Sequence, residues 1–380
     1  MKSRTYEVTL FGATGFTGKL IAHRLARQTD NKPLKWAIAG RSKSKLEELV
    51  HEFGGVKPGM VIADFHDEET LLKMTNQTRI LINVVGPYDL FGDRVIEACL
   101  SSGTHYLDIT GETAFFHRVY QKYDQQAREK SICIVNAAGF DSIPADFGAW
   151  LTAGKLEKNA PILVQAFVKT NARFSSGTWR TAIRAFHQRL IKPGQYTSGS
   201  IRKGNKPRLH KSKLTHRWAL PMPVLDHHVV RRTAKSLPVD YGKDFRYEHY
   251  MSVSTLWKVV RLVVPLGFLA LAIRVSAVRK WLESRFPPGH GPDRETRARS
   301  FFEIRFFGTN GYDLIETSIR GGDPGYDETS KMVVEAAYEI HAKLISGDLQ
   351  SGVCTPVQAL GKPMVKRLHK IGIEITQSSH

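Results

Sequence analysis

The sequence has few cysteines, and their placement excludes two common ways of stabilising a small domain. Its 380 residues contain only Cys99, Cys133 and Cys354, which lie far apart and form no CxxC pair. A disulfide framework or a zinc site needs paired or closely spaced cysteines. We therefore expect a reducing compartment and a cytoplasmic location. The first residues run directly into a strand pattern, so we expect no signal peptide.

The apolar runs are short. The stretch Leu262 to Ile273 contains 12 residues and is interrupted by Pro265 and Gly267. A membrane-spanning helix needs about 20 apolar residues. This stretch therefore predicts a buried or interfacial helix rather than a membrane span.

Acidic residues are missing from one long segment. Residues 158–225 contain no Asp or Glu but 14 Lys or Arg, which accounts for most of the net charge of +19. This excess predicts attraction to an anionic group: a phosphorylated cofactor, a membrane surface or a nucleic acid. We expect no nucleic acid, because no known binding module is present and few aromatic residues alternate with the basic ones. No metal-ligand spacing or Ser-His-Asp pattern is present either, so we expect no metal.

The first 140 residues alternate short apolar strands with helical segments. Strands are expected at YEVTLF, KWAIAG, GMVIAD, RILINVVG, HYLDI and ICIVNAAG, with helices near 17–27, 44–52, 68–74, 94–101 and 115–130. Nearly uniform apolar strands between helices indicate a parallel sheet that is covered on both faces. Six such strands predict a Rossmann-type, doubly wound α/β fold. After Pro144 the pattern changes, with a hairpin expected at Asn310-Gly311 and a helix near 329–345.

A glycine-rich turn follows the first expected strand. The segment GATGFTG comprises Gly12, Ala13, Thr14, Gly15, Phe16, Thr17 and Gly18. The first glycine permits a sharp turn, the second permits close approach to a pyrophosphate, and the third lets the helix lie against the sheet. The helix N-terminus then offers N–H groups and a positive dipole end to phosphate. A strand before this turn and a helix after it favour a dinucleotide site.

The end of the second expected strand predicts which dinucleotide binds. An NAD site usually places an acidic residue here to bind the ribose 2′-hydroxyl, whereas this chain has Gly40, Arg41 and Ser42. The Arg41 guanidinium can pair with a 2′-phosphate and lie against the adenine. Ser42 and Lys45 can add further donors. We therefore expect NADP(H) rather than NAD(H).

Other strand ends should lie beside the same cofactor, since ligands bind at the carboxyl ends of parallel strands. Asp64 is expected either to meet the adenine amino group or to cap the following helix. The segment from Asn83 through Gly86, Pro87 and Tyr88 is expected to run beside the ribose or nicotinamide.

Several blocks together resemble the saccharopine dehydrogenase-like oxidoreductases, and within them the trans-acting enoyl reductases and lipid-associated relatives. They are FGATGFTG, AGRSKSKL, NVVGPYDLFGDRVIEACLSSGTHYLDITGE, NAAGFDSIPADFG, SSGTW, PPGHGP, GGDPGYDETSKMVVEAA and GVCTPVQALG. The resemblance implies an NADP-binding Rossmann domain over residues 1–144 and an inserted second α/β (α+β) domain over 145–325 for substrate or oligomerisation. It also implies a C-terminal helical segment over 326–380 that returns to the first domain.

The chemistry expected is reduction by NADPH, which requires a proton donor near the developing enolate or alkoxide. Candidates at the strand ends are Tyr88, Asp108, Asp141 and Ser142, each of which also has a structural interpretation. We expect an enoyl or keto group of a lipid-like substrate. The alternatives are a membrane-associated NADP-binding protein with little turnover and a saccharopine-type amino-acid dehydrogenase. A homodimer and peripheral association with an anionic membrane, through Leu262 to Ile273 and the basic run Arg180 to Arg217, are also expected.

Overall fold

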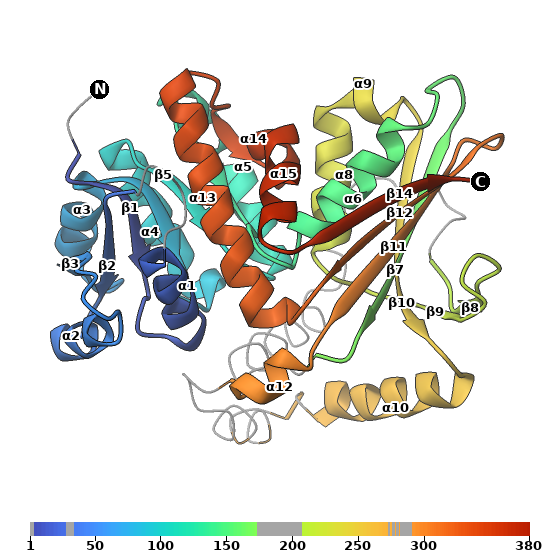
Figure 1. Cartoon of the computed structure of the whole chain (residues 1–380), viewed down its shortest axis with the longest axis horizontal. Helices are drawn as coiled ribbons and strands as arrows, with labels where there is room; N and C mark the ends of the chain where they lie inside the picture. Colours follow the sequence, from blue (N-terminus) through green and yellow to red (C-terminus); the bar gives the residue numbers. More distant parts are fainter. Residues whose placement is uncertain are drawn as a thin grey trace. The chain divides into compact units, whose positions relative to one another are not determined.

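The computed structural model describes residues 4–27, 34–172, 207–272, 274–275, 278, 281 and 291–380 (Figure 1). The chain forms two compact units. The first comprises Met1–Ile143 and Gly325–Ile371, and the second comprises Pro144–Pro324 and Gly372–His380. The C-terminal segment 326–380 therefore does not return whole to the first unit, because its last nine residues join the second.

The first unit is built on a seven-stranded parallel sheet. Its strands are β1 (Tyr6–Phe11), β2 (Trp36–Gly40), β3 (Gly59–Ile62), β4 (Thr78–Asn83), β5 (His105–Asp108), β6 (Cys133–Val135) and β13 (Gly352–Cys354). They lie in the order β13-β6-β5-β4-β1-β2-β3. Six of them follow the 3-2-1-4-5-6 order of a dinucleotide-binding fold, in which the strand order reverses between β1 and β4. The expected doubly wound parallel sheet is confirmed, and β13 extends it from the C-terminal part of the chain.

Helices connect these strands and pack against the sheet. They are α1 (Phe16–Ala26), α2 (Lys43–His51), α3 (Glu68–Asn76), α4 (Tyr88–Ser102), α5 (Thr113–Glu129), α13 (Thr329–Ser346), α14 (Pro356–Leu360) and α15 (Lys362–Lys370). The expected start of α4 near residue 94 was wrong, because Gly92 lies inside the helix. A Cβ at Gly92 would lie 2.4 Å from the Phe115 ring, so this glycine serves close packing and does not break the helix.

The second unit contains a mixed sheet. Its strands are β7 (Ile162–Thr170), β8 (His210–Lys211), β9 (Trp218–Pro221), β10 (Phe245–Val253), β11 (Phe302–Thr309), β12 (Leu314–Gly321) and β14 (Glu374–Ser379), in the order β14-β12-β11-β7-β10-β9-β8. The expected Asn310-Gly311 turn joins β11 to β12, and Asn310 Oδ1 accepts the N–H groups of Tyr312 and Asp313. Its helices are α6 (Ile143–Gly154), α8 (Asp226–Ser236), α9 (Pro238–Tyr241), α10 (Leu256–Ala272) and α12 (Arg294–Ala298), and a short π-helix, η1 (Pro324–Glu328), precedes α13.

Helix α10 contains most of the apolar stretch for which a buried or interfacial helix was expected. A buried helix was wrong, because Val264, Phe268 and Leu271 within that stretch are 47%, 70% and 59% exposed. Among the described residues, no helix is both long enough and apolar enough to cross a membrane. Residues 173–206, which carry much of the basic run Arg180 to Arg217, lie outside the described part of the chain.

Candidate cofactor site and its surroundings

The glycine turn lies where the strand order reverses. Gly12 has a φ of +90°, and a Cβ there would lie 2.8 Å from Val85 in the loop after β4. A Cβ at Gly18 would lie 2.1 Å from the Gly12 carbonyl oxygen. At Gly15 a Cβ would meet nothing nearer than this oxygen, at 3.4 Å. The outer two glycines are thus required by internal packing, whereas the middle one leaves room for an external group.

The N-terminus of α1 differs from those of the next three helices of this unit. Gly15 occupies its N-cap without a side-chain hydrogen bond, and its first turn contains no acidic residue. By contrast, Ser42 caps α2 and Asp67 caps α3 through their side-chain oxygens. The Glu112 carboxylate accepts the N–H groups of Tyr88 and Asp89 at the start of α4. An uncapped helix N-terminus attracts anions, so α1 is the helix among these four that fits a pyrophosphate.

The positive charge expected for a 2′-phosphate is present at the end of β2. Arg41 and Lys45 are exposed, and Gly40 is buried. No hydrogen bond or ion pair of Arg41 occurs within the described part of the chain, so its guanidinium is available to a ligand. The Ser42 hydroxyl accepts from the Lys45 N–H at 3.4 Å and therefore has a capping role. These residues fit an NADP phosphate.

Asp64 does not cap the following helix. Asp67 takes that position and accepts the N–H groups of Glu69 and Thr70. Asp64 lies three residues earlier, and its Oδ1 accepts the His66 N–H at 2.9 Å. The capping interpretation of Asp64 was wrong because α3 begins at Glu68, as expected, so its N-cap position falls at Asp67.

A buried polar network joins the carboxyl ends of β4, β5 and β6. Asp108 is fully buried and accepts from the Asn136 side chain at 2.7 Å and from the Tyr106 hydroxyl at 3.0 Å. It also accepts the backbone N–H groups of Thr110 and Ala137. Tyr106 in turn accepts from the Asn83 side chain at 3.0 Å. Asp108 and Asn83 thus direct their polar atoms into the protein and hold the strand ends together.

Burial and hydrogen bonding act in opposite directions on Asp108. Removal from water raises the pKa of its carboxyl to about 6, against the lowering effect of its four hydrogen-bond donors. Removing the ionised carboxylate from water therefore costs free energy in the folded state, and its hydrogen-bond donors offset this cost only in part.

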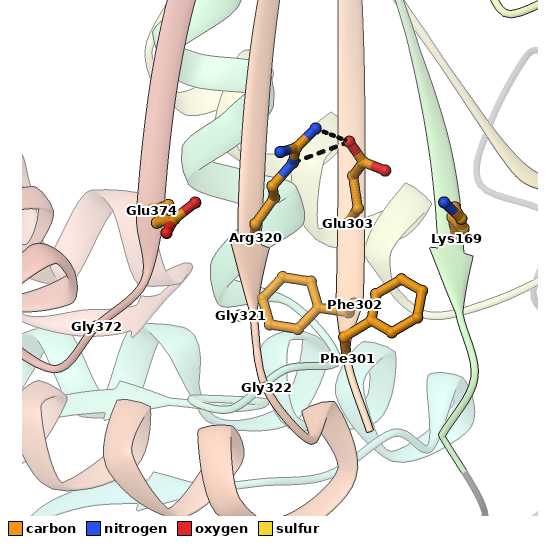
Figure 2. A pocket seen from close by; sticks show the side chains of 9 residues that line it. All are labelled: Lys169, Phe301, Phe302, Glu303, Arg320, Gly321, Gly322, Gly372 and Glu374. Carbon is orange, nitrogen blue, oxygen red and sulfur yellow. Dashed lines mark hydrogen bonds and ion pairs between the residues drawn. The ribbon is translucent and has the colours of Figure 1, made fainter. Parts of the chain in front are cut away.

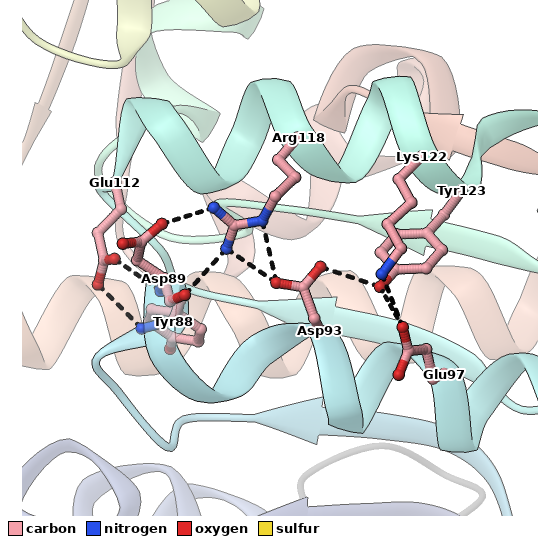
Figure 3. A network of polar contacts seen from close by, with 8 residues as sticks. All are labelled: Tyr88, Asp89, Asp93, Glu97, Glu112, Arg118, Lys122 and Tyr123. Carbon is pink, nitrogen blue, oxygen red and sulfur yellow. Dashed lines mark hydrogen bonds and ion pairs between the residues drawn. The ribbon is translucent and has the colours of Figure 1, made fainter. Parts of the chain in front are cut away.

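Tyr88 is also directed inward. It is buried, its hydroxyl donates to the Asn83 carbonyl at 3.2 Å, and burial raises its pKa well above the usual value. Its N–H donates to Glu112 (Figure 3). These bonds favour the structural interpretation of Tyr88, and its contact with a cofactor remains a proposal.

A ladder of ion pairs continues from this point along α4 and α5 (Figure 3). Arg118 of α5 pairs with Asp89 at 2.6 Å and with Asp93 at 2.8 Å on α4. One turn further along, Lys122 pairs with Glu97 at 2.8 Å. The residues are spaced by four on each helix, so the ladder fixes the register of the two helices and with it the start of α4.

Asp141 and Ser142 follow the turn after β6. Asp141 is exposed, and a Cβ at Gly111, after β5, would lie 2.8 Å from its Oδ2. Ser142 is fully buried, and its hydroxyl has no hydrogen-bond partner within the described part of the chain. Of the four candidate proton donors, Asp141 is therefore the one whose residue is exposed to solvent.

Sequence reasoning did not include the segment before α13 in the site. The Tyr326 ring packs edge-on against Phe16 of the glycine turn, with ring centroids 5.1 Å apart. The Thr329 hydroxyl accepts the Phe140 N–H at 3.1 Å in the turn after β6. The block GGDPGYDETS was noted in the sequence as part of the family resemblance. Its contacts with the glycine turn could not be predicted, because the two segments lie far apart in the chain.

The second unit has a pocket of about 470 Å³ on one side of its sheet (Figure 2). It is lined by Lys169, Phe301, Phe302, Glu303, Arg320, Gly321, Gly322, Gly372 and Glu374. Arg320 pairs with Glu303, and the Lys169 ammonium lies over the Phe301 ring. The four charged side chains have two charges of each sign, so the pocket has no net positive charge. Within the described residues, no cluster of metal-binding side chains occurs.

The Asp108 network predicts a pH-dependent effect of mutation. Between about pH 4 and pH 6 the folded state binds more protons at Asp108 than the unfolded state, because the folded pKa is the higher one. Stability from this group therefore falls as the pH rises through that window. We expect Asp108→Asn to remove this slope and to cost about 1–3 kcal/mol at pH 7, since its amide would face that of Asn136.

Urea unfolding at pH 4.5 and pH 7 measures both effects. The control is Glu47→Gln, which changes an exposed carboxylate in the same unit and should alter the unfolding free energy by less than about 0.5 kcal/mol. An Asp108→Asn variant as stable as the unmutated protein at both pH values would contradict the role given to the network.

Known proteins that are similar to this chain support a cofactor site at the glycine turn. Residues 8–135 match the family described as the saccharopine dehydrogenase NADP binding domain. The chain is 28% identical to the mouse saccharopine dehydrogenase-like oxidoreductase, over 99% of this chain and 98% of the relative. It is 28% identical to the lipid droplet localized protein of Caenorhabditis elegans, over 95% of each chain. A protein of Mycobacterium tuberculosis, provisionally named as a trans-acting enoyl reductase, is 29% identical over 98% of this chain and 97% of its own.

A solved structure shows the same fold over the full length. The apo saccharopine dehydrogenase (L-Glu forming) of Saccharomyces cerevisiae superposes with a TM-score of 0.58 at 13% identity, over 99% of this chain and 100% of that one. Together with the uncapped N-terminus of α1, Arg41 and the strand order, these matches show that residues 8–135 form a saccharopine dehydrogenase NADP binding domain with NADP(H) as its cofactor, in a chain that is similar over nearly its full length to the saccharopine dehydrogenase-like oxidoreductases.

Proposed function

We propose that this protein is an NADPH-dependent reductase that acts on an enoyl or keto group of a lipid-like substrate. The observation that carries the proposal is the Asp141 carboxyl, which follows β6 on the carboxyl side of the sheet that holds the cofactor residues. The residue as a whole is exposed, but burial of its carboxyl raises the pKa to about 6, which suits a group that holds a proton and then donates it. The names of two relatives, one an enoyl reductase and one a lipid droplet protein, support the choice of substrate class. A cytoplasmic location is part of the same proposal.

The cofactor, when bound, supplies a hydride to the acceptor carbon. The chain supplies the binding groups: the uncapped α1 N-terminus for the pyrophosphate and Arg41 for the 2′-phosphate. Reduction also requires a proton for the developing enolate or alkoxide oxygen. Asp141 can take up a proton from solvent and hold it at its carboxyl, whereas Tyr88 and Asp108 use their polar groups within the protein.

The pocket of the second unit does not fit a small dicarboxylate. Such a substrate needs two available cationic groups, but Arg320 is paired with Glu303, and Glu374 adds a further negative charge. This pocket therefore offers no paired cationic site for the amino-acid dehydrogenase alternative. NADPH oxidation with a panel of enoyl-acyl, keto-acyl and amino-acid substrates tests the choice. Turnover with amino acids alone would contradict the proposal.

Arg41→Asp should weaken NADPH binding by about 10- to 100-fold and narrow or reverse the preference over NADH. The variant loses a charge-assisted contact worth about 1.5–3 kcal/mol and places a carboxylate beside a phosphate. Titration calorimetry with both cofactors gives the two affinities. Lys57→Asp, an equal charge change at an exposed lysine elsewhere in the unit, is the control and should bind normally. Equal affinity of the unmutated protein for NADPH and NADH would refute the assignment of Arg41.

Gly15→Val and Gly18→Ala should separate binding from folding. Gly15 has extended backbone angles that valine can adopt, so the variant should fold, but its side chain would occupy the pyrophosphate position. NADPH binding should be lost while the melting temperature stays within a few degrees. Gly18→Ala should instead lower the melting temperature, because its methyl group would collide with the Gly12 carbonyl. A folded Gly15→Val protein with normal NADPH affinity would show that the turn does not hold the phosphates.

Asp141→Asn should reduce the rate of substrate reduction by about 10²- to 10⁴-fold, the usual contribution of a positioned acid or base. NADPH affinity should not change, because Asp141 lies outside the glycine turn. Ser142→Ala is the neighbouring control and should have little effect, since its hydroxyl makes no hydrogen bond within the described residues. Steady-state kinetics across pH would detect the change, and an unaltered rate would exclude Asp141 as the proton donor.

A further inference from the structure

Helix α10 presents a continuous apolar stripe to solvent. Its members recur at helical spacing, so they share one side of the helix: Trp257, Val260, Val264, Phe268 and Leu271, which are 39% to 70% exposed. Val259, between them in sequence but on another side, is buried. Figure 1 shows α10 continuing from the end of β10 in the second unit. The helix is thus attached through one side and leaves the other uncovered.

A stripe of this kind indicates a surface that is covered when the protein functions. Soluble proteins rarely expose contiguous apolar patches larger than a few hundred Å² unless the patch binds a partner or a membrane. Exposed Trp and Phe within such a stripe are typical of the apolar face of a helix that lies at a membrane–water interface. We therefore expect the stripe to contact a partner or a membrane, and the charged residues next to it indicate which of the two.

The charges that α10 and its flanking residues carry are all of one sign. Between His249 and Leu282 the sequence has no Asp or Glu but five basic residues: Lys258, Arg261, Arg274, Arg279 and Lys280. Lys258, Arg261 and Arg274 are exposed and make no ion pair within the described part of the chain. A second copy packed on the same stripe would bring like charges together, whereas anionic headgroups would neutralise them.

The length of α10 limits how it can lie. Its 17 residues give a helix of about 25 Å, shorter than the roughly 30 Å hydrocarbon core of a bilayer. It can lie in the interface with its apolar side at the boundary of headgroups and acyl chains. We propose that α10 docks this protein on an anionic phospholipid surface, with the stripe inserted and Lys258, Arg261 and Arg274 at the headgroups.

This inference goes beyond the proposed reductase activity, and its test does not depend on turnover. The full-length protein is mixed with vesicles of phosphatidylcholine alone or with phosphatidylserine and then floated on a density gradient. We expect flotation with phosphatidylserine that decreases at high salt, because exposed charges are screened, but does not vanish. Trp257→Glu combined with Phe268→Glu should reduce vesicle binding at least tenfold.

Two matched controls distinguish the stripe from general hydrophobicity. Val239→Glu and Tyr312→Glu replace residues of the second unit that are 84% and 87% exposed but lie outside α10, and both should float normally. An unchanged circular dichroism spectrum and melting temperature show that each variant is folded. Failure of the unmutated protein to float at low salt with phosphatidylserine vesicles would overturn the proposal. Normal flotation of the α10 double variant would also overturn it. So would an unmutated protein that is a dimer without vesicle binding and that the double variant converts to a monomer.

Discussion

The carboxyl edge of the first sheet depends on one buried carboxylate, that of Asp108. It receives hydrogen bonds from Tyr106, Asn136 and two backbone N–H groups, and these join the ends of β5 and β6. Through Tyr106 it also reaches Asn83 at the end of β4. Removing water from a carboxylate is costly unless its lone pairs are satisfied. The group is tolerated because four donors converge on it, and the same donors fix the loops that surround the cofactor residues.

Helices α1 to α4 on this edge differ in whether their N-terminal N–H groups have hydrogen-bond partners. The first N–H groups of α2, α3 and α4 donate to oxygen atoms of Ser42, Asp67 and Glu112. Helix α1 begins at a glycine with no such partner. Among these four helices, an anionic cofactor is therefore directed to α1, because the N-termini of the other three are already satisfied. The α4–α5 ion pairs support this arrangement by holding the start of α4 against Glu112 (Figure 3).

The expectations drawn from the sequence succeeded where the controlling interactions are local. The spacing of Gly12, Gly15 and Gly18 after an apolar strand predicted the turn, and the absence of an acidic residue near Arg41 predicted the cofactor that the family comparison supports. The parallel sheet followed from the alternation of strands and helices. The start of α4 was misplaced, because a helix start depends on which oxygen atom reaches the first N–H groups. For α4 that oxygen belongs to Glu112, 24 residues later.

By itself, the sequence determined the fold class of the first unit, the glycine turn and the charge at the end of β2, since each rests on residues close together in the chain. Tertiary structure alone decided that β13 completes the first sheet while β14 joins the second. It also decided that Asp108 faces inward, that the Asp141 residue is exposed while its carboxyl is partly removed from water, and that α10 is attached by one side only. The physical reason is that burial is a property of contacts between distant segments. An apolar helix has the same sequence pattern whether protein, solvent or lipid covers its second side.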